Sequence, residues 1–96
     1  MANVYRKRTG KPQADIPITQ IHLTTKEAQV LQLLAENPGR IFSRNSLLTM
    51  IWGYADGVIS RTADVHIQRL RKKLKGNVAL RIRTIVGQGY VLEHAG

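Results

Sequence analysis

One stretch, residues 61–75, constrains the fold more than any other part of the chain, and it reads RTADVHIQRLRKKLK. Its apolar residues Ala63, Ile67, Leu70 and Leu74 recur at intervals of four, three and four. An α-helix turns by about 100° per residue, so these four side chains share one narrow stripe. Most of the remaining surface is basic. The stretch therefore predicts an amphipathic helix with one buried side and one side directed at a negatively charged partner.

The charge of the whole chain supports the same kind of partner. Fifteen lysines and arginines stand against six aspartates and glutamates, which gives a net charge of +9. Eight of the fifteen basic residues lie between Arg61 and Arg83. A localised positive potential attracts polyanions, and nucleic acid is the commonest of these.

The composition also argues against several classes of protein. There is no cysteine, which excludes a disulfide framework and a thiolate metal site. No apolar run reaches the roughly 18–20 residues needed to span a bilayer, and the N-terminus lacks the apolar segment of a signal peptide. Paired carboxylates, a catalytic triad and metal-ligand spacing are absent, and His66 has no second ligand beside it. We therefore expect a cytoplasmic binding protein with no catalytic residue, metal or cofactor, and no membrane contact.

The N-terminal part is predicted in two pieces. Residues 1–15 are polar and basic, and they form either a frayed terminus or a short strand through Val4 and Tyr5. Residues 16–96 are expected to form the domain. Within it, residues 16–23 carry Ile16, Ile18 and Ile21, which indicates a half-buried strand that Pro17 confines to a sheet edge.

Two helices are predicted next from their end signals. Thr24 and Glu27 match the capping box, in which each side chain bonds the backbone amide of the other residue. That helix continues to about Glu36. Ser43 can cap a second helix, and Gly53 can end it in the left-handed conformation.

The C-terminal part changes to strand periodicity. Residues 80–85 alternate between apolar and polar side chains, residues 87–89 form a turn that needs positive φ, and residues 90–92 return as a second strand. Three helices followed by a hairpin predict an α+β winged helix-turn-helix, in which the hairpin is the wing and the helix at residues 61–75 is the recognition helix.

The exposed side of that helix favours DNA over a merely solvated surface. It carries Arg61, Val65, Gln68, Arg69 and Lys72, a mixture of basic, amide and aliphatic groups. Arginine can bond guanine, glutamine can bond adenine, and an aliphatic group can pack on a thymine methyl in the major groove. The residues that flank this side are placed to reach phosphates: Thr62, His66, Arg71 and Lys73.

Five motifs stand in order between Leu23 and Leu92: L-T-x-x-E, S-R-x-x-L-L, W-G, R-T-x-D-V-H-I-x-x-L-R-K-K-L and G-x-G-Y. In this combination the chain resembles the effector domain of OmpR/PhoB-type response regulators. The resemblance implies a winged helix with a small N-terminal antiparallel sheet, for which we expect two or three strands here. It also implies binding to promoter DNA as a tandem dimer on direct repeats, and a loop that touches RNA polymerase.

The resemblance and the residue types together assign four groups of residues. The base-facing group is Thr62, Asp64, Val65 and Arg69. The phosphate group is Arg61, His66, Gln68, Arg71, Lys72, Lys73, Thr84 and Tyr90. The wing group is Arg81, Arg83, Val86 and Gln88. The polymerase-facing loop is Tyr54, Ala55, Asp56, Gly57, Val58, Ile59 and Ser60.

Two positions depart from the family pattern. Val86 stands where the family usually has an arginine that reaches the minor groove, and Arg81 or Arg83 are the candidates to replace it. Gln68 stands where a basic residue is common. We expect sequence-specific binding of double-stranded DNA by a bacterial transcription regulator. The alternative is a nucleoid or RNA-binding protein that uses charge alone.

Overall fold

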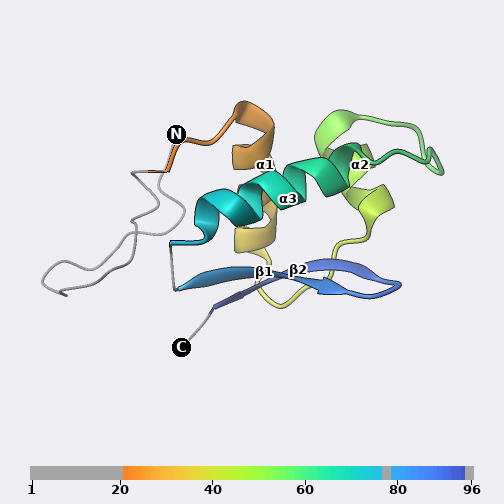
Figure 1. The fold of residues 1–96 in the computed structure, drawn as a ribbon. Coiled ribbons are helices and arrows are strands. Elements are labelled where there is room, and N and C mark those ends of the chain that lie inside the picture. The colour runs from red at the N-terminus through yellow and green to blue at the C-terminus, as the bar shows by residue number, and fades with distance from the viewer. Residues whose placement is uncertain (1–20, 77–78, 95–96) are drawn as a thin grey trace, which may run out of the picture.

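The computed structural model describes residues 21–76 and 79–94. Its elements are the helices α1 (Thr25–Glu36), α2 (Arg44–Trp52) and α3 (Thr62–Leu74), followed by the strands β1 (Leu80–Ile85) and β2 (Gly89–His94). Figure 1 shows α3 running through the middle of the molecule, with the β1–β2 hairpin along one side of it. This order and arrangement confirm the predicted winged helix-turn-helix.

The first two helices begin and end as their local signals predict. The Glu27 amide donates to Thr24 Oγ1 at 3.2 Å, and the Thr24 amide donates to Glu27 Oε1 at 3.0 Å, which completes the capping box of α1. At the start of α2, Ser43 Oγ accepts from the Ser46 amide at 3.0 Å. Gly53 ends α2 with φ 72°, a left-handed conformation that glycine adopts without steric cost.

The third helix buries the stripe that its sequence predicts. Ala63, Ile67, Leu70 and Leu74 are each 3% exposed or less. The helix lies one residue inside the predicted bounds at each end, and Ser60 Oγ accepts from the Thr62 amide at its start. The stripe packs on buried residues of the other elements: Val30, Leu31, Leu34, Phe42, Leu47, Leu48, Leu80, Ile82, Tyr90 and Leu92.

Backbone hydrogen bonds join the hairpin to the helices. The two strands are antiparallel, with Ile82 opposite Leu92, and both of these side chains lie in the core. The segment before α2 pairs with β2, because the Phe42 amide donates to the Tyr90 carbonyl at 2.8 Å and the Tyr90 amide donates back at 2.9 Å. The wing is therefore fixed to the helix-turn-helix through main-chain contacts.

The predicted N-terminal sheet lies almost wholly outside the described residues, as do both alternatives for residues 1–15. Of the strand predicted at residues 16–23, only 21–23 are described, and these residues are not in a strand. Ile21 and Leu23 pack against the core. The sheet and its number of strands stay a prediction. Among residues 21–76 and 79–94, no helix is long and apolar enough to span a bilayer.

The turn between the strands gives a test of the wing's attachment. Gly89 has φ 144°, and a Cβ added there would lie 2.1 Å from the Phe42 carbonyl oxygen, whereas Gly87 has φ 77° with open space around it. We expect Gly87→Ala to lower the free energy of unfolding by about 1 kcal/mol, from the backbone conformation alone. Gly89→Ala should lower it by about 3 kcal/mol or more, because the clash adds to the strain. Urea unfolding followed by Trp52 fluorescence measures both losses, and equal losses would contradict this account.

Candidate nucleic-acid interface

The side of α3 opposite the buried stripe is open to solvent. All five residues predicted there are exposed: Arg61, Val65, Gln68, Arg69 and Lys72. Val65 keeps 41% of its surface accessible, although it is aliphatic and lies between two buried residues of the stripe in the sequence. This valine is not buried in the core, so its methyl groups are available to contact a partner.

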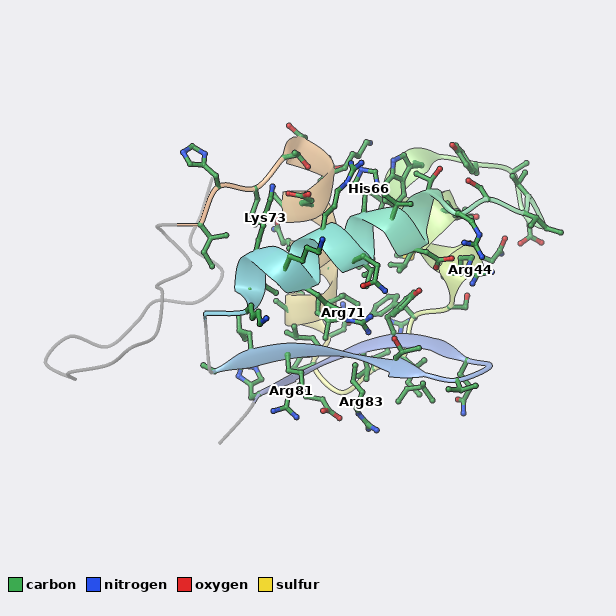
Figure 2. The ribbon with its side chains drawn as sticks, in the orientation of Figure 1. Arg44, His66, Arg71, Lys73, Arg81 and Arg83 are labelled. Carbon is green, nitrogen blue, oxygen red and sulfur yellow. The ribbon has the colours of Figure 1, made fainter. Side chains whose placement is uncertain are left out.

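Two residues on the flanks of α3 form contacts within the protein. Arg71 Nε donates to the Ile82 carbonyl at 3.0 Å, and its Nη2 bonds Thr84 Oγ1. Figure 2 shows Arg71 directed from α3 towards the hairpin. On the other flank, His66 Nδ1 lies 2.8 Å from the Thr62 carbonyl oxygen, which can only accept, so Nδ1 carries a hydrogen. The His66 ring also packs edge-on against Trp52, with centroids 4.8 Å apart.

Lys73, which the sequence places among the phosphate-reaching residues, is half-buried and forms an ion pair with a buried glutamate. Its Nζ lies 2.6 Å from Glu27 Oε1, and Glu27 is 1% exposed. Burial acts to raise the pKa of the Glu27 carboxyl, but hydrogen bonds from Lys73 and Thr24 and the Lys73 charge outweigh it and hold that pKa below its ordinary value of 4.5. The pair therefore contributes stability above pH 4.5, and this stability is lost as the pH falls through the lower folded-state pKa.

The Asp64 carboxylate lies at the junction of three elements. Arg44, the first residue of α2, donates from Nε to Asp64 at 3.0 Å. The Tyr90 hydroxyl of β2 donates to the same carboxylate at 2.6 Å. Burial raises the pKa of the Tyr90 hydroxyl, and the bond to Asp64 acts in the same direction. In the sequence, Arg44 stands only as the second residue of the motif S-R-x-x-L-L, and its partner Asp64 lies 20 residues away, so the local pattern does not predict this contact.

The wing presents an uncharged tip. Val86 is 91% exposed at the turn, and Gln88 beside it is exposed. The two wing arginines lie further back on β1 and point away from α3 (Figure 2). Arg83 forms an ion pair with Glu93 at 2.9 Å, and Arg81 is exposed. The structure therefore does not bring these arginines to the tip.

The loop between α2 and α3 is anchored by one side chain of α2. Asn45 Nδ2 donates to Asp56 Oδ1 at 2.6 Å, and Asn45 Oδ1 accepts from the Gly57 amide at 3.0 Å. Val58 and Ile59 are 41% and 94% exposed. An open cleft of about 470 Å³ separates this loop from the hairpin turn. In the part of the chain that the structure describes, no three His, Cys, Asp or Glu side chains form a group that could hold a metal ion.

A helix-turn-helix with a basic, exposed second helix and an attached hairpin defines a winged-helix nucleic-acid-binding domain. The chain belongs to the family described as "Transcriptional regulatory protein, C terminal", whose model matches residues 19–92. This is the effector domain of OmpR/PhoB-type response regulators. Its members are DNA-binding domains that act in transcription regulation, and this chain is one of them.

Relatives and solved structures agree with this assignment. The chain is 48% identical over 73 residues to the heme response regulator HssR of Staphylococcus aureus, a match that covers 75% of the chain and 33% of HssR. The chain thus spans about a third of the length of the curated relatives it matches. The DNA-binding domain of Klebsiella pneumoniae RstA, solved with the RstA box, superposes with a TM-score of 0.67 at 36% identity, covering 76% of this chain and 74% of that one. The DNA-binding domain of Bacillus subtilis CssR gives a TM-score of 0.65 at 35% identity, covering 75% and 78%.

The ion pair between Lys73 and Glu27 gives a second test. We expect Lys73→Met to lower the free energy of unfolding by about 3 kcal/mol at neutral pH, because it leaves the Glu27 carboxylate buried without its partner. Lys72→Met is the matched control: the neighbouring lysine is exposed, so its loss should be within about 0.5 kcal/mol. Equilibrium unfolding in urea compares the two variants. Two equally small losses would show that the pair contributes little.

Proposed function

We propose that α3 docks in the major groove of duplex DNA and that its exposed side reads base edges there. The observation that carries this proposal is the 41% exposure of Val65 beside the exposed Arg69, on a helix whose opposite stripe is buried. A helix that needed only positive charge would gain nothing from an exposed valine among its basic residues. A major groove offers thymine methyl groups to an aliphatic side chain and guanine edges to an arginine.

The contacts divide into those that discriminate and those that position the helix. Arg69 and Val65 are proposed to face bases, with Thr62 at the edge of that contact. Residues beside them are proposed to lie along the phosphates: Arg61, His66, Gln68 and Lys72. In His66 the Thr62 carbonyl takes the Nδ1 hydrogen, so a phosphate contact has to come from Nε2 carrying a hydrogen of its own, as both nitrogens do in the positively charged ring. Phosphate contacts supply affinity without sequence information.

Finer assignments extend the proposal to the whole protein. We propose that residues 54–60 face RNA polymerase, which is supported by the exposure of Val58 and Ile59 on a loop that Asn45 holds in place. Two copies are proposed to bind direct repeats in tandem. The chain would act in the cytoplasm by binding, without a catalytic step, as the output domain of a two-component response regulator.

Selection from a pool of random duplexes, with competitor DNA in excess, tests the central proposal. We expect the chain to enrich a defined sequence, and the spacing of repeated half-sites in that sequence tests tandem binding. Enrichment of no sequence would contradict base reading and would favour the alternative, a nucleoid or RNA-binding protein that uses its charge alone.

Replacement of Arg69 tests the principal base contact. Arg69→Ala should weaken binding to the selected site by about 1–3 kcal/mol and weaken binding to random duplex less, because a bidentate contact to a base is lost. Arg81→Ala is the control, since Arg81 is also an exposed arginine but points away from α3 (Figure 2). Competition binding on both kinds of duplex measures the change. Equal losses on the two would remove Arg69 from the base-reading residues.

Replacement of Lys72 tests the phosphate contacts. Lys72→Ala should weaken binding to every duplex alike, and it should reduce the slope of log affinity against log salt by about 0.9, the value for one phosphate contact fewer. Titrations at several salt concentrations give the slope, with Arg81→Ala again as the control. An unchanged slope in Lys72→Ala would place this lysine away from the DNA backbone.

A further inference from the structure

One carboxylate on α3 holds the other two parts of the DNA-binding unit. Asp64 lies in the first turn of α3 and accepts from Arg44 at the start of α2 and from Tyr90 on β2, at 3.0 and 2.6 Å. Only 21% of its side-chain surface is exposed. A residue whose only role was to contact a base edge would not need hydrogen-bond partners on two other elements.

The Tyr90 hydroxyl has a single hydrogen, and it is committed to Asp64. A tyrosine hydroxyl can donate one hydrogen bond, and both a carboxylate and a phosphate can only accept. Tyr90 therefore cannot bond a phosphate through that hydrogen while it bonds Asp64. The residue is also buried, with 8% of its surface exposed. In this geometry the Tyr90 hydroxyl is a partner of Asp64 and not a donor to a phosphate.

A second link joins α3 to the hairpin about two turns further along the helix. The Arg71 guanidinium lies 5.6 Å from the centre of the Tyr90 ring, and its Nε donates to the Ile82 carbonyl. Asp64 and Arg71 thus hold β2 and β1 from two points on one helix. Two points of attachment fix both the distance of the hairpin from α3 and the rotation of α3 about its own axis.

We propose that Asp64 is a positioning residue, which sets the orientation of α3 against α2 and the hairpin through Arg44 and Tyr90 and so decides which bases Val65 and Arg69 reach. This inference rests on the proposed function, in which α3 reads bases. It differs from a direct contact between Asp64 and a base edge, which is the role that the sequence motif implies.

A small rotation of α3 is enough to alter recognition. A group about 6 Å from the helix axis moves by roughly 1 Å when the helix rotates by about 10°. Contacts that select a ligand have to be placed within about 0.5 Å. Loss of the Asp64 attachments would therefore affect every base contact that α3 makes, whereas loss of a direct base contact would affect one base pair.

Three variants separate these two roles. Asp64→Ala removes both attachments. Tyr90→Phe removes one attachment and keeps the buried ring. Asp64→Asn keeps an oxygen that can accept from Tyr90 and Arg44 but carries no charge. The quantity compared is the ratio of affinity for the selected site to affinity for random duplex, determined also for single substitutions at each base pair of the site. Removing a negative charge beside DNA strengthens binding to both duplexes, and this effect cancels in the ratio.

Positioning predicts that Asp64→Ala and Tyr90→Phe each lower the ratio by about tenfold, with discrimination reduced at several base pairs. The double variant should be no worse than Asp64→Ala, because both changes break the same link. Asp64→Asn should stay within about threefold of the unaltered chain. Thermal unfolding of each variant sets the temperature, below every transition, at which binding is measured.

Two other outcomes would overturn the inference. In the first, Asp64→Ala and Asp64→Asn both lose discrimination at one base pair, and Tyr90→Phe is unaffected. This result would assign Asp64 a direct base contact. In the second, the ratio of affinity for the selected site to affinity for random duplex is unchanged in all three variants. This result would show that the Asp64 carboxylate does not contribute to recognition. If the unaltered chain itself selects no sequence, the proposed function fails, and that result is visible before any variant is compared.

Discussion

The burial of one narrow stripe on α3 is the constraint on which the rest of the structure depends. Each fully buried aliphatic side chain contributes about 1.5–3 kcal/mol through removal from water. Ile67, Leu70 and Leu74 are at most 3% exposed, so rotating the helix would expose apolar surface. The stripe therefore fixes which side of α3 faces outwards, and Val65 and Arg69 lie on that side. The core therefore determines which side of α3 is left exposed, and this is the side that we propose to bind DNA.

Polar contacts then place the neighbouring elements on this helix. Lys73 pairs with Glu27 of α1, and Asp64 bonds Arg44 of α2. Asp64 and Arg71 bond the hairpin. As a result, the basic residues of α3 have two different tasks. Lys73 and Arg71 hold the fold together, whereas the exposed basic residues are free to meet phosphates. The net charge of the chain overstates the charge that α3 offers to DNA.

The hairpin of this chain differs from a wing with a basic tip. Val86 is 91% exposed and Gln88 is exposed, whereas Arg83 is paired with Glu93 further back on the strands. We propose that α3 carries a larger share of the specificity here than in relatives with an arginine at the tip. The close packing of Gly89 on the Phe42 carbonyl then has the role of holding the hairpin against the helices.

The sequence by itself determined the helices, their caps, the buried stripe and the hairpin, because each depends on residues within a few positions of one another. The capping box of Thr24 and Glu27 spans three residues, and the stripe of α3 follows from the helical period. Only the tertiary structure decided the partners of Lys73 and Tyr90, which lie 46 and 26 residues from the acids they bond. The type of a charged or polar side chain shows that it can bond either another residue of the protein or a phosphate. Which of the two it is placed to bond depends on how distant elements pack together.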